Sequence, residues 1–373
     1  MTVVLSIMGT RPEAVKMAPV IRELAKYPDR VKSIVCSTGQ HREMLRHVFD
    51  LFGIRPDVEL DVMEPDQSLS GLTARLFDAI DPVVRQCRPD WILAQGDTTT
   101  VMVAALVAFY HRIRFGHVEA GLRTGDLQRP FPEELNRCVA DKVSTLLFAP
   151  TERSRRTLLG EGHAQDGIIV TGNTVIDALD YVAALPYDWS SGPLRKLPAD
   201  KRLVLVTAHR RESFGEPFRD LCCGLRELAE RFAADGVHFV YPVHLNPNVR
   251  RPVQELLGAA DNISLMDPLD YLSLVHLMKR SSLILTDSGG IQEEAPGLRV
   301  PVLVMRDTTE RPEGVEAGVV KLVGTSRERI VEEASRLLCD PTAHAAMAGG
   351  ANPYGDGRAA HRIVSALLEY DGR

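Results

Sequence analysis

Short apolar runs rich in β-branched residues alternate with helix-length amphipathic segments through two long stretches of this chain. In the first stretch the runs are Val3–Met8, Lys32–Ser37, Trp91–Gln95, Phe115–Val118, Thr145–Ala149 and Ile168–Val170. In the second they are Leu203–Thr207, Val237–Val243, Ile263–Leu265, Leu283–Thr286, Val300–Met305 and Val319–Val323. This alternation is typical of parallel sheets covered by helices on both faces. The chain is therefore expected to be α/β, with two doubly wound sheets.

The alternation stops between Leu185 and Lys201, where Pro, Gly, Ser and charged residues crowd together without apolar periodicity. A loop or domain junction is expected near this segment, and 373 residues are enough for about two domains. A last amphipathic helix is expected from about Arg358 to Tyr370, after the turn cluster NPYGDG. Two such sheets facing each other would surround one cleft with the carboxyl ends of their strands, where ligands of this architecture bind.

Composition excludes several classes of protein. The net charge of −6 gives no global reason to bind nucleic acid. The six Cys include no Cys-x-x-Cys pair, and the adjacent Cys222 and Cys223 suit neither a zinc site nor a disulfide framework. The N-terminal MTVVLSIM resembles a strand more than a signal peptide, and no apolar run approaches the ~18 residues of a membrane span. We expect a cytoplasmic protein without membrane partners.

The first predicted strand turns into a helix through MGTRPEAVK, which places Arg11 and Lys16 near a helix N-terminus that favours an anion. The segment is neither a Gly-x-Gly-x-x-Gly fingerprint nor a Walker A loop, which argues against nicotinamide, flavin and ATP hydrolysis. Taken alone, it is equally explained by surface charges beside a helix cap.

Carboxylates follow two strands of the first stretch. Asp97 lies in GDTTT after Trp91–Gln95, and Glu119 lies in EAGLR after Phe115–Val118. Another carboxylate, Glu133, lies in RPFPEELNR. An acidic residue after a strand is often only a helix cap. Three carboxylates at loop tips of one sheet are harder to explain in that way and favour an acid/base site.

Histidines follow two strands of the second stretch. His209 begins HRRE and adds positive charge there, although a merely packed histidine is the alternative. His244 lies in YPVHLNPNVR, whose Asn-Pro spacing is equally consistent with a rigid turn.

The most specific segment is LILTDSGGIQEEAP, followed by VPVLVMRDTTERPE. The small residues of Asp287–Gly290 would let backbone amides at a helix start approach a phosphate. Glu294 is placed to accept hydrogen bonds from a ribose, and Arg306 and Arg311 could add counter-charge to a diphosphate. A Gly-Gly helix start alone is also explained by local structure.

Together these segments resemble the non-hydrolysing bacterial UDP-N-acetylglucosamine 2-epimerases. The motifs that carry the resemblance are GTRPEAVKMAP, QHREML, GDTTT, GHVEAGLRTGD, PFPEELNR, GNTVIDAL, TAHRRESFGE, YPVHLNPNVR, DSGGIQEEAP, RDTTERPE and NPYGDGRA. The resemblance implies a GT-B fold of two Rossmann-like domains with an interdomain cleft, and a homodimer without metal or other cofactor. It places an N-terminal domain at residues 1–170 plus 357–373 and a UDP-binding domain at 171–356.

The resemblance also implies an activity, the interconversion of UDP-N-acetylglucosamine and UDP-N-acetylmannosamine through anti elimination of UDP to 2-acetamidoglucal and re-addition. Asp97, Glu119 and Glu133 match the family's catalytic carboxylates. His209 is assigned as a phosphate donor, with an acid/base role as the alternative. The residues implied to hold the nucleotide are Arg11, His209, Ser288, Gly289, Gly290, Glu294 and Arg311, with Lys16 near the anionic or sugar portion.

The chain departs from the family pattern at two places. Family members often carry an aromatic residue beside the uracil where this chain has Leu274, while Leu269 is compatible with contact through its backbone. Some members bind a second substrate molecule as an activator. The residues at the matching positions are Gln40, Glu43, Asp66 and His244. Glu43 and Asp66 replace a neutral and a cationic contact by two acids, which argues against activation.

Three other functions remain open at this stage. A GT-B glycosyltransferase and a hydrolysing epimerase would share a site that holds UDP, but an acceptor-dependent transferase does not need three acids around sugar carbon 2. A nucleotide-sugar sensor would bind tightly without turnover.

Overall fold

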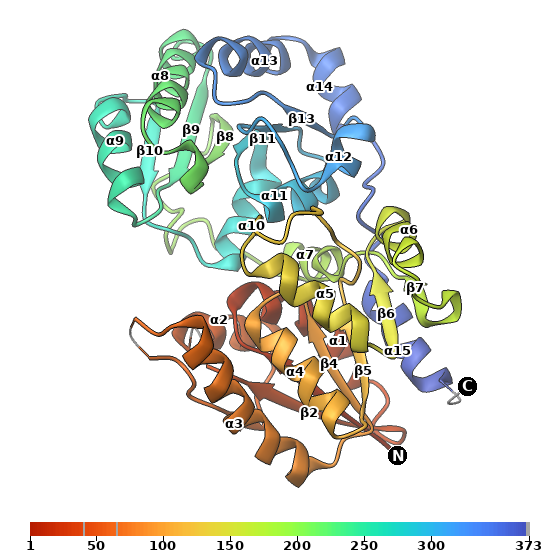
Figure 1. Cartoon of the computed structure of the whole chain (residues 1–373). Helices are drawn as coiled ribbons and strands as arrows, with labels where there is room; N and C mark the ends of the chain where they lie inside the picture. The colour runs from red at the N-terminus through yellow and green to blue at the C-terminus, as the bar shows by residue number, and fades with distance from the viewer. Residues whose placement is uncertain (40–41, 65, 371–373) are drawn as a thin grey trace. The chain divides into compact units, whose positions relative to one another are not determined.

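The computed structural model describes residues 1–39, 42–64 and 66–370 (Figure 1). Contacts divide the chain into two compact units, Met1–Ala178 with Tyr354–Arg373, and Leu179–Pro353. One unit contains a 7-stranded sheet and the other a 6-stranded sheet. The predicted fold class is confirmed, because both units are Rossmann-like and doubly wound, the pair that makes up a GT-B fold.

The first unit has its strands in the order β3-β2-β1-β4-β5-β6-β7, and every pairing is parallel. Its strands are β1 (Thr2–Met8), β2 (Val31–Ser37), β3 (Val58–Glu59), β4 (Trp91–Gln95), β5 (Arg114–Val118), β6 (Leu146–Ala149) and β7 (Ile168–Val170). The order reverses between β1 and β4, and ligands of open α/β sheets bind beyond the carboxyl ends of the strands at such a switch point.

Helices cover both faces of this sheet. They are α1 (Arg11–Leu24), α2 (Arg42–Phe52), α3 (Leu69–Cys87), α4 (Thr99–Tyr110), α5 (Glu133–Val143), α6 (Glu152–Gly160) and α15 (Ala359–Glu369). The boundary between the two units falls inside helix α7 (Thr174–Ala183). Helices α3, α4 and α5 pack side by side on one face, where Leu76, Val103 and Ala140 are fully buried (Figure 1). On the other face α1 packs against α2 and α15.

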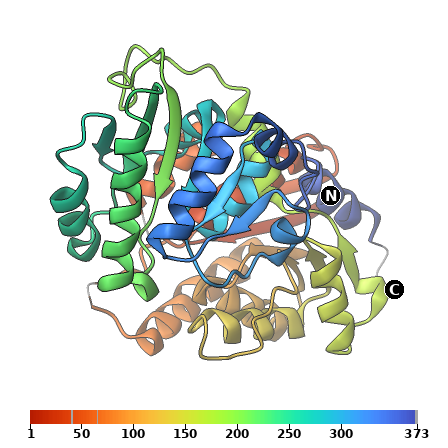
Figure 2. The same cartoon turned by 90° about the horizontal axis from the view of Figure 1, so that it is seen from above.

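The second unit repeats this architecture with the strand order β10-β9-β8-β11-β12-β13. Its strands are β8 (Arg202–Thr207), β9 (Val237–Pro242), β10 (Ile263–Met266), β11 (Ser281–Thr286), β12 (Val302–Val304) and β13 (Val320–Leu322). Its helices are α8 (Glu216–Arg231), α9 (Pro247–Leu257), α10 (Tyr271–Arg280), α11 (Gly289–Glu294), α12 (Pro312–Glu316), α13 (Arg327–Cys339) and α14 (Pro341–Ala348). Helices α8, in green, and α13, in blue, lie side by side in Figure 2. Here the order reverses between β8 and β11.

The structure adds one strand to those predicted from the sequence. Strand β3 comprises only Val58 and Glu59, which is too short to show a periodic pattern. The segment between Leu185 and Lys201 is irregular, as expected, but it packs within the second unit. Arg280 donates to the Pro198 carbonyl oxygen at 2.7 Å and stacks over Trp189.

Gly116 on β5 offers a test of packing in the first unit. A Cβ atom there would lie 2.6 Å from Leu93 Cδ2 and 3.1 Å from Phe148 Cε2. We expect Gly116→Ala to lower the free energy of unfolding by about 1–3 kcal/mol through overpacking. Urea denaturation followed by the fluorescence of Trp91, in the neighbouring strand β4, measures this change. The control is Gly160→Ala, which has no atom within 4 Å of the added Cβ and should be neutral; equal effects of the two substitutions would contradict the expectation.

Candidate active site

The turn after β1 is tied to the turn after β4 by Glu13, on the first turn of α1. Its carboxylate accepts the Gly9 N–H at 3.0 Å, the Thr10 N–H at 2.6 Å and the Thr98 hydroxyl at 2.7 Å. Burial raises the pKa of Glu13, although these hydrogen bonds oppose the increase. Glu13 was not among the site residues expected from the sequence, and its only local signal is the Thr-x-x-Glu capping box at the start of α1. Arg11 and Lys16 lie on the helix that this network fixes.

Glu119 follows β5 with a left-handed backbone, at φ 70°. Its carboxylate accepts hydrogen bonds from Lys16 Nζ at 2.5 Å and from Gln95 Nε2 at 2.7 Å. The side chain is only 6% exposed, so the ion pair with Lys16 lies in a partly desolvated place. The structure therefore brings together two of the predicted site residues, Lys16 and Glu119, from α1 and the end of β5.

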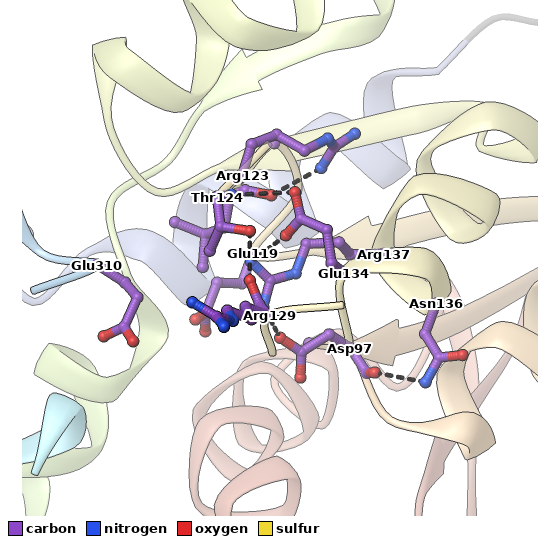
Figure 3. Close-up of polar contacts among 12 residues, drawn as sticks. Asp97, Glu119, Arg123, Thr124, Arg129, Glu134, Asn136, Arg137 and Glu310 are labelled. Carbon is purple, nitrogen blue, oxygen red and sulfur yellow. Dashed lines mark hydrogen bonds and ion pairs between the residues drawn. The ribbon is translucent and has the colours of Figure 1, made fainter. Parts of the chain in front are cut away.

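Asp97, at the end of the neighbouring strand β4, is held by helix α5 (Figure 3). Arg137 forms an ion pair with Asp97 Oδ2, and Asn136 Nδ2 donates to the Asp97 carbonyl oxygen at 2.9 Å. The Asp97 side chain keeps 30% of its surface exposed, so a second partner can still reach its carboxylate.

Glu133 begins α5, one turn before Arg137, and is half-buried. In the described part of the chain, no side chain or backbone group hydrogen-bonds to its carboxylate. The adjacent Glu134 instead accepts the Thr124 N–H at 3.0 Å and the Gly125 N–H at 2.9 Å, which fixes the loop before the helix (Figure 3). Helix α5 thus carries one predicted catalytic carboxylate and holds another, Asp97.

In the second unit, the turn after β8 is fixed by Asp287, which is 1% exposed at the end of β11. Its Oδ2 accepts the His209 N–H at 2.5 Å and the Arg210 N–H at 2.7 Å. The His209 ring stacks on His244, with 5.3 Å between ring centroids. Burial lowers the pKa of His209, and the nearby Asp287 carboxylate only partly opposes this, so the neutral ring is favoured at pH 7.

Gly289 and Gly290 open helix α11 directly after Ser288. A Cβ atom at either glycine would meet nothing closer than 3.8 Å, and neither has a positive φ. The protein's own packing therefore does not require glycine at these positions. The absence of side chains at Gly289 and Gly290 would instead let a ligand approach the backbone closely.

Two other residues predicted to hold the nucleotide, Glu294 and Arg311, have partners inside the second unit. Glu294 is buried and accepts a hydrogen bond from the Tyr271 hydroxyl at 2.6 Å. Arg311 forms an ion pair with the buried Glu293. Leu269 is buried and Leu274 is half-buried.

Arg306 does not have the free charge that the sequence suggested. Its side chain is 4% exposed, and Nε donates to Glu212 at 2.6 Å. The two terminal nitrogens donate to Glu310 at 2.9 and 3.1 Å. Two carboxylates therefore already neutralise this guanidinium, and it supplies little net charge to a diphosphate.

The residues matched to the activator site are only partly described. Gln40 and the side chain of Glu43 lie outside the described residues. Asp66 is exposed with φ 51°, and His244 is exposed apart from its stacking on His209.

Within residues 1–39, 42–64 and 66–370, no three His, Cys, Asp or Glu side chains lie close enough to hold a metal ion. No helix of the described chain has the length and apolar character needed to cross a bilayer.

Comparison with known proteins decides the family. The family model for UDP-N-acetylglucosamine 2-epimerase matches residues 22–368. The chain is 52% identical over 372 residues to the UDP-N-acetylglucosamine 2-epimerase of Escherichia coli (strain K12), and the match covers 98% of each protein. The chain belongs to the UDP-N-acetylglucosamine 2-epimerase family. The resemblance seen in the sequence motifs is thereby confirmed.

Solved structures of other members of this epimerase family superpose on the chain. The enzyme of Neisseria meningitidis bound to UDP-N-acetylglucosamine is 47% identical with a TM-score of 0.90, covering 99% of this chain and 100% of that chain. The enzyme of Methanocaldococcus jannaschii in complex with UDP-N-acetylglucosamine and UDP is 32% identical with a TM-score of 0.81, with the same coverage.

The Arg306 cluster predicts a pH dependence of stability. Burial alone would raise the pKa of Glu310, but the hydrogen bonds and charge of Arg306 lower it from 4.5 to about 2. A lowered folded-state pKa stabilises the fold fully above the unfolded value, and this contribution is lost as the pH falls toward 2. We expect Glu310→Gln to reduce the unfolding free energy by about 1–2 kcal/mol at pH 7, and the difference from wild type to shrink below pH ~4.5.

The measurement is urea denaturation at a series of pH values, followed by Trp189 of the second unit in a Trp91→Phe background. The control Glu332→Gln removes an exposed carboxylate on α13 and should change nothing. A difference between wild type and Glu310→Gln that stays constant down to pH 2 would contradict the expectation.

Proposed function

We propose that this chain interconverts UDP-N-acetylglucosamine and UDP-N-acetylmannosamine by eliminating and re-adding UDP. The hydrogen on sugar carbon 2 is not next to a carbonyl carbon, so simple enolisation cannot make it acidic. In anti elimination a base takes this proton, and the C–H electron pair forms the C1–C2 double bond of 2-acetamidoglucal. UDP leaves carbon 1 with the electrons of the C–O bond. UDP then adds back at carbon 1, and a proton is delivered to the opposite face of carbon 2.

Asp97, Glu119 and Glu133 are assigned to the proton transfers and to steadying positive charge at carbon 1. The observation that carries this assignment is the placement of Asp97 and Glu119 after the carboxyl ends of adjacent parallel strands. In addition, Asp97 accepts a hydrogen bond from the helix that begins at Glu133. Such a path needs an acid on one face of carbon 2 and a base on the other. Lys16 adds a cation beside Glu119.

The second unit is assigned to the uridine diphosphate. The backbone from Ser288 to Gly290 offers N–H groups to a phosphate, and His209 is the preferred side-chain donor. Arg311, Glu294, Leu269 and Leu274 complete the proposed nucleotide contacts, and Arg11 of the first unit adds positive charge. Resemblance to the family further supports a homodimer that needs no cofactor.

Replacing each catalytic carboxylate by its amide tests the proton transfers. We expect Asp97→Asn, Glu119→Gln and Glu133→Gln to lower kcat by ~10²- to 10⁴-fold, because each amide keeps the shape of the side chain but cannot exchange a proton. Proton NMR of UDP-N-acetylglucosamine incubated with enzyme in deuterated water measures both product formation and exchange at carbon 2.

Glu23→Gln is the matched control, because Glu23 also lies on the first unit and pairs with a lysine at 2.5 Å, but at the other end of α1. It should retain the turnover of the wild type. Near-normal turnover in all three amide variants, or product without deuterium at carbon 2, would rule out the mechanism. Release of free N-acetylmannosamine would instead favour a hydrolysing epimerase.

Gly290→Ala tests the phosphate assignment. The added Cβ has room in the protein, so the melting temperature should not fall, whereas UDP affinity should drop ~10-fold or more because the methyl group blocks close approach of the ligand. Isothermal titration with UDP measures the affinity, with Gly160→Ala as the control. Unchanged UDP affinity in Gly290→Ala would remove this loop from the nucleotide site.

A further inference from the structure

A completely buried histidine–aspartate pair bonds to the backbone segments that follow β4 and β5 in the first unit. His117, on β5, and Asp141, on α5, both have side chains that are 0% exposed. His117 Nδ1 lies 2.5 Å from Asp141 Oδ1, and His117 Nε2 lies 2.7 Å from the carbonyl oxygen of Gly96. Neither residue can touch a substrate, and neither has a role in the chemistry proposed above.

The partners of this pair define its protonation state. A carbonyl oxygen can only accept, so His117 Nε2 must carry a proton. The other oxygen of Asp141 accepts the Gly121 N–H at 3.1 Å and contacts Arg123 at 2.7 Å, as suits an ionised carboxylate. Nδ1 therefore also carries a proton, and the ring is an imidazolium. Burial works against this charge, but the Asp141 carboxylate outweighs it and raises the pKa of His117.

The pair is bonded to the backbone on both sides of the proposed site. Gly96 is the residue before Asp97, and its carbonyl oxygen is held by His117. Gly121 is two residues after Glu119, and its N–H is held by Asp141. Glu119, between β5 and Gly121, has a left-handed backbone at φ 70°. For a residue with a Cβ atom, this conformation persists only when surrounding contacts determine it.

We propose that His117 is a positioning residue for epimerisation, which as an imidazolium bonded to Asp141 and to the Gly96 carbonyl oxygen fixes the backbones that carry Asp97 and Glu119 relative to each other. This inference rests on the roles proposed for these two carboxylates. A misplacement of about 1 Å in reacting groups can cost ~10²-fold in rate. Loss of the tether is therefore expected to lower kcat far more than it changes substrate binding.

Two substitutions separate the two bonds of the ring. In His117→Asn the amide nitrogen occupies the place of Nδ1, so it can bond to Asp141 but cannot reach the Gly96 carbonyl oxygen. In His117→Gln the amide nitrogen can reach the place of Nε2 and bond to Gly96, while the bond to Asp141 is lost. We expect His117→Asn to lower kcat by ~10- to 100-fold with KM within ~3-fold of wild type. His117→Gln breaks the other bond of the same tether and should lower kcat over the same range.

His111→Asn is the matched control. His111 also bonds to a carboxylate, Asp81, at 2.6 Å, but it lies at the far end of α4, before β5 begins. It should leave kcat and KM within ~2-fold of wild type. UDP titration gives a second control, because the nucleotide is assigned to the other unit and the affinity of His117→Asn for UDP should match the wild type. A kcat within ~2-fold of wild type in His117→Asn or in His117→Gln would overturn the inference.

A measurement on the wild-type enzyme keeps the inference testable if His117→Asn does not fold. Nitrogen-15 NMR of histidine-labelled enzyme should show one buried ring protonated at both nitrogens at pH 7.5, and this signal should disappear in His117→Gln. A neutral ring at His117 would overturn the inference.

Failure of the tether can be distinguished from failure of the proposed carboxylate roles. If Asp97→Asn and Glu119→Gln lose turnover while His117→Asn does not, only the tether fails. If those amide variants are fully active, the proposed roles of the carboxylates fail whatever His117 does.

Discussion

The left-handed backbone of Glu119 is the constraint around which the first unit is built. A residue with a Cβ atom holds such a conformation at a cost of roughly 1–3 kcal/mol, which other contacts must offset. The Phe148 carbonyl oxygen accepts the N–H groups of Glu119 and Ala120, at 3.0 and 3.1 Å. Lys16 and Gln95 hold the carboxylate from α1 and β4. The conformation therefore depends on contacts from separate parts of the chain, and the position of the carboxylate is fixed only once these parts have packed together.

Buried carboxylates fix strand-end backbones in both units. Glu13 accepts the N–H groups of the first turn, Asp141 accepts that of Gly121, and Asp287 accepts those of His209 and Arg210. A carboxyl oxygen gives these N–H groups an acceptor where the regular sheet bonding ends. Asp97 differs because part of its side chain remains exposed. Glu13, Asp141 and Asp287 thus hold backbone from buried positions, whereas Asp97 and Glu133 stay partly accessible.

The sequence predicts the strands and the residues that follow them well, because both depend on local patterns. The apolar runs and the polar residues after them are visible in one dimension, and the carboxyl ends of parallel strands meet at one edge of a sheet. The pairing of Arg306 with Glu212 and Glu310 depends on loop conformation and could not be predicted in this way. His117 lies inside a strand and Asp141 in the middle of a helix, so each looks like an ordinary core or surface residue until α5 packs on the sheet. Only Glu13 left a local signal, its capping box.

The first unit is made of two separate pieces of chain, and this affects how the protein is synthesised. Residues from Tyr354 onward return to it: the Tyr354 carbonyl oxygen accepts the Asn173 N–H at 2.7 Å, and Asp177 accepts the N–H groups of Ala359 and Ala360. Helix α15 covers α1. On the ribosome, the N-terminal piece emerges first but waits uncovered until translation has passed through the whole second unit. The face of α1 that α15 covers consequently stays without this partner for most of the synthesis of the chain.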